Sequence, residues 1–369
     1  MEVPRINLSS VFENKRVFLT GHTGFKGSWL ALWLHSLGAK VYGYSLPPPT
    51  EPSNYVLSNV RGVLCGETLG DIRDRRLMRE TSAAFKPDVV FHLAAQPLVR
   101  DSYARPFDTF EVNVMGTASV LDAVRDFGRP CAVVCITTDK CYENREQVWG
   151  YRESDPMGGY DPYSASKGAA EILIASYRRS FFHPDRIPEH GVQLASARAG
   201  NVVGGGDWAR DRIVTDMVAA LAAGRPVPVR NPYAIRPWQH VLEPLSGYLT
   251  LAAAMLNRPA ALWCEGWNFG PATGTETTVS ELLDNFIQGW GAGSWTDVSD
   301  PRHPHEASTL RLCIDKSLSV LGWAPCWSLK EAVCRTALWY KGVLCDGASP
   351  QALCLGDIEA YCKSGRDCT

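Results

Sequence analysis

The sequence has almost no excess charge and no long apolar run, and these absences exclude several classes of protein. The 369 residues carry a formal net charge of −2, which does not favour binding to nucleic acid or to an anionic membrane. No stretch reaches the roughly 20 apolar residues of a membrane helix, and residues 1–5 lack a signal-peptide pattern. With 45% hydrophobic and 21% charged residues, the chain is typical of a globular enzyme, which we expect in the cytoplasm.

The sequence also lacks the cysteine spacing of a metal site or a disulfide framework. Twelve cysteines are present, but no two form a C-x-x-C pair, so we predict neither zinc ligands nor disulfides. His303 and His305 have no thiol or carboxylate framework around them, so we predict no metal. Four cysteines lie in apolar, strand-like surroundings that predict buried thiols: Cys65, Cys131, Cys135 and Cys313. The role of four others, in a C-terminal tail of weak pattern, stays open: Cys345, Cys354, Cys362 and Cys368.

A strand, a glycine turn, a helix and a second strand follow one another near the start of the chain. The β-rich run 16–20 leads into the loop 21–27, an apolar helical pattern continues over 29–37, and a strand resumes at 41–45. In such a βαβ unit the glycines let the backbone approach a pyrophosphate, and the helix N-terminus supplies N–H donors and a positive dipole end. The pattern therefore predicts a dinucleotide site rather than a structural turn.

The glycine loop has the spacing G-x-x-G-x-x-G, which resembles the extended branch of the short-chain dehydrogenase/reductase family. The resemblance implies an α/β fold of Rossmann type, a doubly wound parallel sheet with a smaller C-terminal substrate-binding lobe, and NAD as the cofactor. It places six loop residues at that cofactor: Gly21, Thr23, Gly24, Phe25, Lys26 and Gly27. His22 and Lys26 are unusual there, and each either contacts the phosphates or points into solvent.

Residues after the next strands complete the predicted cofactor site. The second strand ends without an Asp or Glu, so the choice of NAD over NADP rests on the family resemblance alone. Asp71 and Ile72 resemble the family's adenine-contacting pair, although Asp71 could instead cap a helix. Residue Gln96 begins a loop at the carboxyl edge of the sheet, where we expect substrate. The fourth strand resembles the family's motif that leaves room for the cofactor, through Leu93, Ala94 and Ala95.

Two long segments, 107–127 and 163–179, carry apolar residues at helical spacing. In the extended family the equivalent helices pair with a partner subunit, so the resemblance implies a homodimer or a larger assembly. Packing inside one subunit would give the same periodicity, and the sequence leaves both explanations open.

The alternation of strands and helices becomes irregular after a sixth strand at 192–199. We predict a dinucleotide-binding domain over 1–200, a mainly substrate-binding lobe over 201–345, and a tail over 346–369 whose role stays open. Within the lobe, helices are predicted near 212–223, 241–256, 278–289 and 329–341, the third with a capping box from Thr278 to Glu281.

The spacing of Tyr163 and Lys167 points to oxidation of a hydroxyl group. Residues four apart lie on one helix face, so the ammonium can sit beside the phenol and stabilise its phenolate. Oxidation of an alcohol needs such a base. With Thr138 at the end of the fifth strand, these residues match the Thr-Tyr-Lys set of the family, in which the lysine also bonds the nicotinamide ribose.

Asp139 and Lys140, directly after Thr138, narrow the choice among the reactions that this family catalyses. The family's nucleotide-sugar 4,6-dehydratases need an acid and a base at this point, and Thr-Asp-Lys resembles the subgroup that acts on CDP-glucose rather than on dTDP-glucose. Further segments match that subgroup, among them 21–29, 94–100, 198–208 and 230–247. The resemblance implies a lyase of deoxysugar biosynthesis.

The implied reaction has three steps on one hexose. Tyr163 takes the C4 hydroxyl proton as NAD oxidises C4, with Thr138 bonded to the same oxygen. Lys140, needed neutral, then removes the C5 proton while Asp139, needed protonated, gives a proton to the departing C6 hydroxyl. Reduction at C6 and reprotonation at C5 finish the cycle. Lys140 could instead merely pair with Glu143 or Asp161.

Positive and donor groups from the second lobe are predicted to hold the nucleotide diphosphate. The candidates are Asn201, Arg230, Arg236, Arg302 and His305, each of which could instead be an ordinary surface residue. Two other functions stay open, another dehydratase or 4-epimerase of the family and a noncatalytic dinucleotide sensor. A sensor has no use for an intact Tyr163, Lys167 and Asp139.

Overall fold

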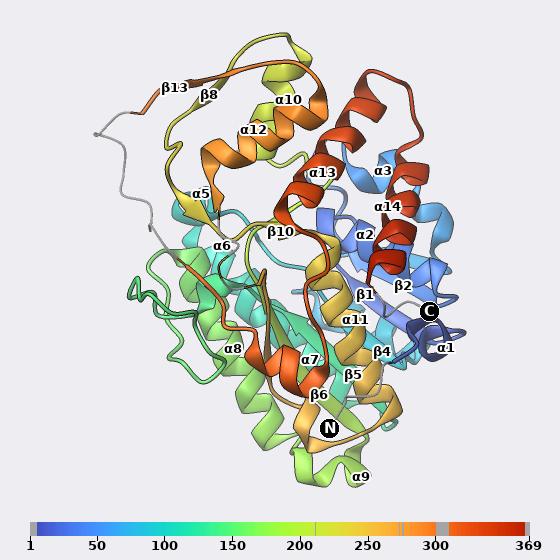
Figure 1. Cartoon of the computed structure of the whole chain (residues 1–369). Coiled ribbons are helices and arrows are strands. Elements are labelled where there is room, and N and C mark those ends of the chain that lie inside the picture. Colours follow the sequence, from blue (N-terminus) through green and yellow to red (C-terminus); the bar gives the residue numbers. More distant parts are fainter. Residues whose placement is uncertain (1–5, 211, 273, 275–276, 300–309, 366–369) are drawn as a thin grey trace.

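Seven parallel strands form the central sheet of the computed structural model, which describes residues 6–210, 212–272, 274, 277–299 and 310–365. The strands lie in the order β11-β6-β5-β4-β1-β2-β3, and each neighbouring pair is parallel (Figure 1). The direction of winding reverses between β1 and β4, which confirms the predicted doubly wound fold. The strands are β1 Arg16–Thr20, β2 Lys40–Ser45, β3 Gly66–Leu69, β4 Val89–His92, β5 Cys131–Ile136, β6 Val192–Ala199 and β11 Gly266–Phe269.

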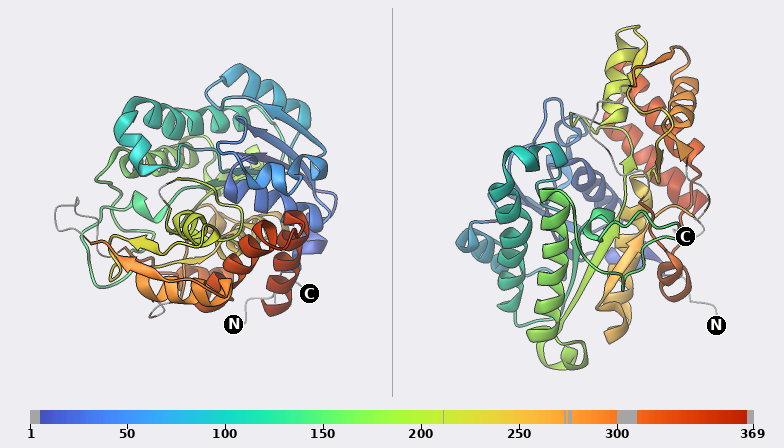
Figure 2. Two further views of the ribbon diagram at one scale, coloured as in Figure 1. Left: turned by 90° about the horizontal axis from the view of Figure 1, so that it is seen from above. Right: turned by 90° about the vertical axis from the view of Figure 1, so that its left-hand side faces the viewer.

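Helices cover both faces of this sheet, because its buried strands carry apolar side chains on both sides. In β1, Val17 and Leu19 belong to one core and Phe18 to the other. Helices α2 and α11 pack in the first core and α4, α7 and α8 in the second, and Figure 2 shows green α8 and gold α11 on opposite sides of the sheet. Their bounds are α2 Phe25–Ser36, α4 Arg75–Phe85, α7 Gly116–Arg125, α8 Pro162–Ser180 and α11 Leu242–Asn257.

The helix predicted over 107–127 is interrupted by a wide π turn. Helix α6 (Pro106–Phe110) continues into this turn, η2 (Glu111–Met115), before α7 begins. A π turn changes which side of the helix faces the core. Leu121, after the turn, is buried as expected, whereas Phe110 before it is 39% exposed. Other short helices are α1 Leu8–Phe12, α3 Asn54–Leu57, α5 Val99–Ala104 and α9 Ile187–His190.

The second half of the chain builds the smaller lobe and also returns to the sheet. Strand β11 joins β6 at one edge, and α11 packs beneath it. The predicted lobe helices form as α10 Ile213–Ala222, α12 Val279–Trp290 and α13 Leu329–Leu344, with the predicted capping box at α12. Short strands pair as β7 Val202–Val203 with β10 Gln239–His240, β8 Val227–Val229 with β13 Trp295–Asp297, and β9 Ile235–Arg236 with β12 Thr277–Thr278. The boundary near residue 200 remains a proposal.

The C-terminal tail, expected to have little pattern, folds as helix α14 (Pro350–Ser364) beside α2 (Figure 1). Its buried stripe is Cys354, Ile358 and Tyr361, at the spacing of one helix face. The Tyr361 ring meets the Trp33 ring of α2 edge-on, with centroids 5.6 Å apart.

Tyr361 also belongs to a buried polar cluster around Glu243 of α11. The Glu243 carboxylate accepts a hydrogen bond from the Tyr361 hydroxyl at 2.6 Å and from the backbone N–H groups of Cys326 at 2.9 Å and Trp327 at 2.6 Å. Burial raises the pKa of Glu243, although these donors oppose the shift. The tail therefore supplies one of the hydrogen-bond donors to the buried Glu243 carboxylate.

Two of the four cysteines predicted to be buried are so. Cys131 and Cys135 lie inside β5, whereas Cys313 is half-buried and Cys65 is exposed. The prediction for Cys65 was wrong because it precedes β3, the edge strand of the sheet. In the described part of the chain, no helix has both the length and the apolar character needed to cross a membrane.

We expect Tyr361→Phe to lower the free energy of unfolding by about 1–3 kcal/mol, because a buried carboxylate loses a hydrogen-bond donor. Urea unfolding of the variant measures this, with Tyr103→Phe as the control since Tyr103 is 59% exposed. Equal stability of the two variants would contradict the role assigned to α14.

Candidate active site

The glycine loop after β1 is packed so closely that side chains would not fit. Gly21 has a φ of +77°, and a Cβ there would lie 2.7 Å from the Ala94 nitrogen. A Cβ on Gly27 would lie 2.0 Å from the Gly21 oxygen. Gly24, at the N-cap of α2, offers no side-chain cap to the N-terminal N–H groups of that helix. The loop therefore presents backbone donors and a helix N-terminus at the carboxyl edge of the sheet.

His22 takes neither of the two positions considered for it. Its ring is buried against Gly43, with Nε2 3.0 Å from Glu67 Oε2. Burial lowers the pKa of His22, although Glu67 opposes the shift. Thr23 lies within the same loop, where its hydroxyl is 2.8 Å from that of Ser45 on β2. His22 thus stabilises the loop through buried contacts with β2 and β3, which the local sequence pattern did not predict.

The predicted adenine-side residues follow β3. The Asp71 carboxylate pairs with Arg73 at 2.7 Å, which holds the pKa of Asp71 below its ordinary value. Asp74, not Asp71, caps α4 by accepting from the Leu77 N–H, so the helix-cap alternative for Asp71 was wrong. The Ile72 side chain is buried, and a Cβ on Gly116 would lie 2.5 Å from its Cδ1.

The chain after β4 is held by Thr20 and by its own side chains. The Thr20 hydroxyl accepts from the backbone N–H groups of Leu93 at 3.1 Å and Ala94 at 3.2 Å. The Gln96 side chain donates to Leu98 O at 3.1 Å and to the Thr109 hydroxyl at 2.9 Å. Leu93 packs on the first core, Ala94 on the second, and Ala95 follows them into the loop. Gln96 therefore fixes the shape of the loop in which it was predicted to bind substrate.

Tyr163 and Lys167 of α8 both lie beside the end of β5, where Thr138 follows the strand. The Tyr163 hydroxyl is hydrogen-bonded to Thr138; burial raises the pKa of Tyr163 to about 12, while this bond and the charge of Arg212 oppose the rise. The Lys167 ammonium donates to Ile136 O at 3.4 Å, and burial lowers its pKa to about 8 against the opposing charge of Glu171.

Asp139 and Lys140 follow on the short turn η3 (Asp139–Cys141). The Asp139 carboxylate is buried and accepts from the Thr138 hydroxyl at 2.9 Å. The Lys140 ammonium lies 3.9 Å from Asp139 Oδ1 and is one-third exposed. Lys140 therefore pairs with its own neighbour, the predicted acid, and this is not the alternative pairing with Glu143 or Asp161.

A glycine on α8 makes this convergence possible. Gly168 lies between Lys167 and the next turn of the helix, and a Cβ there would lie 2.4 Å from Gly158 O and 3.2 Å from Cys141 O. The loop that leaves η3 therefore lies directly on the backbone of α8.

Two further cations lie at the same place. Burial lowers the pKa of Lys26 to about 8; the charges of Arg212 and Lys167 add to the shift and that of Asp139 opposes it. Lys26 is thus close to the predicted catalytic residues rather than in open solvent. Arg212, which sequence reasoning missed, pairs with Asp207 at 2.7 Å. The sequence did offer a hint, because both residues follow the glycine-rich connector 200–206 that comes directly after β6.

The residues predicted to bind substrate lie farther apart from one another than the predicted catalytic residues do. Asn201 follows Gly200, where a Cβ would lie 2.9 Å from Asp139 Oδ2, so this connector borders the acid. Arg230 is exposed after β8, and Arg236 lies in β9 with Nη1 3.0 Å from Ile235 O. Arg302 and His305 lie outside the described residues.

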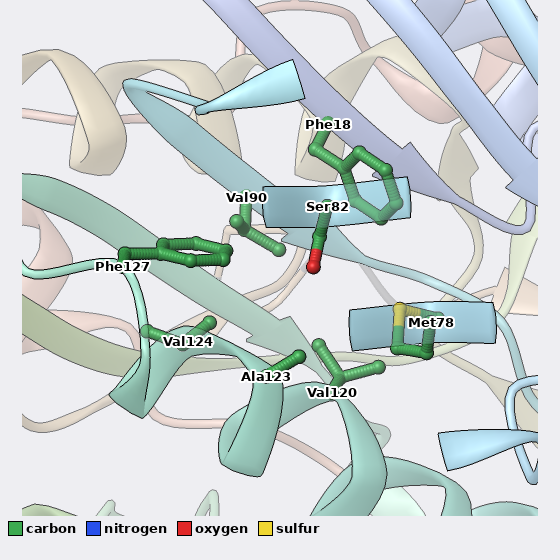
Figure 3. A pocket seen from close by; sticks show the side chains of 8 residues that line it. All are labelled: Phe18, Met78, Ser82, Val90, Val120, Ala123, Val124 and Phe127. Atoms are coloured by element: carbon green, nitrogen blue, oxygen red, sulfur yellow. The ribbon is translucent and has the colours of Figure 1, made fainter. Parts of the chain in front are cut away.

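The crevice in Figure 3 is separate from this site. It lies in the second core between α4 and α7, and its one polar side chain, Ser82, donates to Arg79 O at 3.3 Å. The space is too narrow for a water molecule. It is a packing gap lined by Phe18, Met78, Ser82, Val90, Val120, Ala123, Val124 and Phe127.

Comparison with known proteins gives consistent matches over most of the chain. A family model described as GDP-mannose 4,6 dehydratase matches residues 18–336. A CDP-glucose 4,6-dehydratase of Salmonella typhimurium is 51% identical, covering 89% of this chain and 91% of that protein. A dTDP-glucose 4,6-dehydratase of Streptomyces antibioticus is 30% identical, covering 74% and 75%. Among solved structures, DesIV of Streptomyces venezuelae, a dTDP-glucose 4,6-dehydratase with NAD bound, aligns with a TM-score of 0.73 at 25% identity, covering 88% and 97%.

We expect Gly168→Ala to lower the free energy of unfolding by about 1–3 kcal/mol, since the added methyl overlaps backbone that cannot move freely. Gly356→Ala, inside α14 with open space around it, should instead stabilise the protein by roughly 0.5–1 kcal/mol. Paired urea unfolding curves measure both. A Gly168→Ala variant as stable as the parent would contradict the close packing of α8.

Proposed function

The chain belongs to the GDP-mannose 4,6 dehydratase family, and from that premise we propose that it is an NAD-dependent lyase that converts CDP-glucose to CDP-4-dehydro-6-deoxyglucose and water. One observation carries the proposal: a phenol, a hydroxyl, a carboxyl and an amine are linked at the carboxyl edge of the sheet, from Tyr163, Thr138, Asp139 and Lys140, with the Lys167 amine beside them at the end of β5. The choice of CDP-glucose rests on the Salmonella relative.

The glycine loop fits NAD. Side chains at Gly21 and Gly27 would clash with the backbone of Ala94 and of Gly21, so glycines are needed for this tight turn, and the N-terminus of α2 has no side-chain cap that would compete with a pyrophosphate. DesIV, the structural relative, has NAD bound. We assign to this cofactor the predicted set Gly21, Thr23, Gly24, Phe25, Lys26, Gly27, Asp71, Ile72, Leu93, Ala94, Ala95, Tyr163 and Lys167. Bound NAD supplies a reversible oxidant for C4.

Tyr163 is the proposed base for the C4 hydroxyl. A buried phenol of high pKa is protonated at neutral pH, so the site must favour the phenolate during reaction. Thr138, through its hydrogen bond, and Arg212, through its charge, both lower the pKa of Tyr163 against the effect of burial. Oxidation at C4 makes the neighbouring C5 proton acidic, which prepares the elimination.

Asp139 and Lys140 are the proposed acid and base of water loss. The reaction needs a protonated acid and a neutral amine, and the Lys140 nitrogen lies 3.9 Å from Asp139 Oδ1, where the two groups can also exist as an ion pair. Both forms hold the same number of protons, so one proton transfer from Lys140 to Asp139 converts the resting pair into the reactive one. Lys140 then takes the C5 proton, Asp139 protonates the C6 hydroxyl, and Lys140 later returns its proton to C5.

The Thr138 hydroxyl connects the two ends of this proton cycle. After one turnover Tyr163 has gained a proton and Asp139 has lost one. Thr138 is bonded to both, at 2.9 Å to Asp139 Oδ1. Passing the surplus proton from Tyr163 through Thr138 to Asp139 restores the starting state without exchange with solvent.

The substrate carries a diphosphate, for which we propose donors from both the lobe and the dinucleotide-binding domain. Lys26 and Arg212 are electrostatically coupled to the catalytic residues and join the predicted set Gln96, Asn201, Arg230, Arg236, Arg302 and His305. The cytoplasmic location remains a prediction.

We also propose that two copies of the chain form a homodimer through α6, the π turn and α8. Large apolar side chains are exposed on α6, on the π turn and on α8, and they are the kind of surface that a partner subunit buries. They are Phe107, Phe110, Met115 and Ile172.

We expect the protein with NAD to convert CDP-glucose to a product lighter by one water, and Tyr163→Phe to reduce the rate at least about 100-fold because the base is lost. Mass spectrometry of parallel reactions with CDP-, dTDP-, UDP- and GDP-glucose measures both. A product of unchanged mass would indicate 4-epimerisation, and full turnover by Tyr163→Phe would refute the catalytic assignment.

Asp139→Asn should separate oxidation from dehydration. The amide has no acidic proton for the C6 hydroxyl, so we expect reduced cofactor to accumulate at 340 nm while water loss slows at least about 100-fold. Asp122→Asn, on α7 away from the site, serves as the control. Equal loss of the 340 nm signal and of dehydration would contradict the assignment of Asp139 as the acid.

A further inference from the structure

A buried carboxylate lies one helical turn beyond Lys167, and the proposed mechanism does not use it. Glu171 is 4% exposed on the same face of α8 as Tyr163 and Lys167. One oxygen accepts from the Thr137 hydroxyl at 2.5 Å, and the other from the Ser196 hydroxyl at 2.8 Å. Because Thr137 directly precedes Thr138, this carboxylate joins the end of β5 to the catalytic helix.

The charge of Glu171 is matched by a buried arginine. Arg198 on β6 donates from Nη2 to Glu171 at 2.8 Å and from Nη1 to the Tyr142 hydroxyl at 2.7 Å. Burial alone would raise the pKa of Glu171, but Arg198, Thr137 and Ser196 together hold it below the ordinary value. Glu171 is therefore an anion at neutral pH.

The network continues into the segment that carries Asp139 and Lys140. The Tyr142 hydroxyl donates to Asn268 Oδ1 at 2.8 Å, and Asn268 Nδ2 donates to Tyr151 O at 2.9 Å. Arg198 also donates to Glu153 O at 3.0 Å. The loop after Lys140 is thus attached to β6 and β11 through the same ion pair.

We infer that Glu171 is a positioning residue of the reaction: its carboxylate fixes the end of β5 against α8 and places a buried negative charge one helical turn from Lys167. The chemistry of this inference rests on the proposed function. Glu171 touches neither substrate nor cofactor in this account, so it acts through Thr137 and Lys167.

Several other titratable groups face Lys167. Cys135 on β5 and Cys141 on η3 have pKa values raised by burial, and buried His92 on β4 has a pKa lowered to about 3, so all three are neutral near pH 7. Lys26 on α2 titrates in the same range as Lys167. Glu171 is therefore the anion that offsets Lys167, and Lys26 is the group from which its titration must be distinguished.

Removing the charge of Glu171 has a defined consequence. An amine keeps its proton below its pKa, and the Glu171 anion raises the pKa of Lys167 against burial. Without that anion the pKa falls, so Lys167 loses its charge at lower pH. The alkaline limb of the rate profile should move down by about one pH unit.

Two measurements on NAD-loaded Glu171→Gln test this. The first is the pH profile of kcat with CDP-glucose, where we expect the alkaline limb to shift. The second is competitive acylation with acetic anhydride from pH 6 to 10, in which mass spectrometry follows the Lys167 peptide separately from that of Lys26. The midpoint for Lys167 should fall by about one unit, and that for Lys26 should change less.

Three further variants separate charge, position and folding. Glu171→Gln/Arg198→Met removes both buried charges. We expect the Tm of this double variant to return toward that of the parent, whereas the pH midpoint of Lys167 acylation should stay as low as in Glu171→Gln. Thr137→Val keeps the charge and loses the bond to β5, so kcat should fall several-fold with the limb unmoved. Glu80→Gln, at a side chain 61% exposed, is the control for both readouts.

An unshifted Lys167 midpoint in Glu171→Gln would overturn the electrostatic role, and full activity of Thr137→Val would overturn the positional one. Recovery of activity together with Tm in the double variant would show that Glu171 is only structural. If the parent protein fails to dehydrate CDP-glucose but the midpoint still shifts, the proposed function fails while the assignment of Glu171 to Lys167 stands.

Discussion

The contact between helix α8 and the chain that leaves β5 is the constraint on which the rest of the site depends. Tyr163 and Lys167 come from the helix, and Thr138 and Asp139 come from the end of the strand. Neither element alone holds a set of groups that can oxidise and dehydrate a sugar. Gly168 lets the two backbones approach to a distance that any side chain would prevent. The parallel sheet does the remainder, because its topology opens the carboxyl ends of β1 and β4 for a dinucleotide beside this contact.

Burial of ionisable groups next to one another gives this contact its chemical character. Desolvation raises the pKa of Tyr163 and lowers those of Lys167 and Lys26, so all three move toward their neutral forms. Thr138 lies between Tyr163 and Asp139, and Lys140 lies beside the same carboxylate. A small shift of protons within this group changes which member is acid and which is base. The site is therefore suited to a reaction in which no net proton or oxidant is consumed.

Much of this arrangement could be predicted from sequence, because it rests on local patterns. The glycine loop, the strand ends and the spacing of Tyr163 and Lys167 are short-range signals, and the fold follows from the βαβ alternation. What failed depended on contacts between distant segments. The burial of His22 requires Gly43 and Glu67, the exposure of Cys65 requires knowing which strand lies at the edge, and the docking of α14 requires Trp33. No local pattern carries such information.

The central claim is that one site oxidises C4 and reduces C6 of the same hexose. The most direct test is to supply CDP-glucose labelled with deuterium at C4 and to locate the label in the product by NMR. The account predicts that the deuterium appears at C6 of the same molecule, in a product that has lost water. Deuterium retained at C4, or released to the medium, would contradict it.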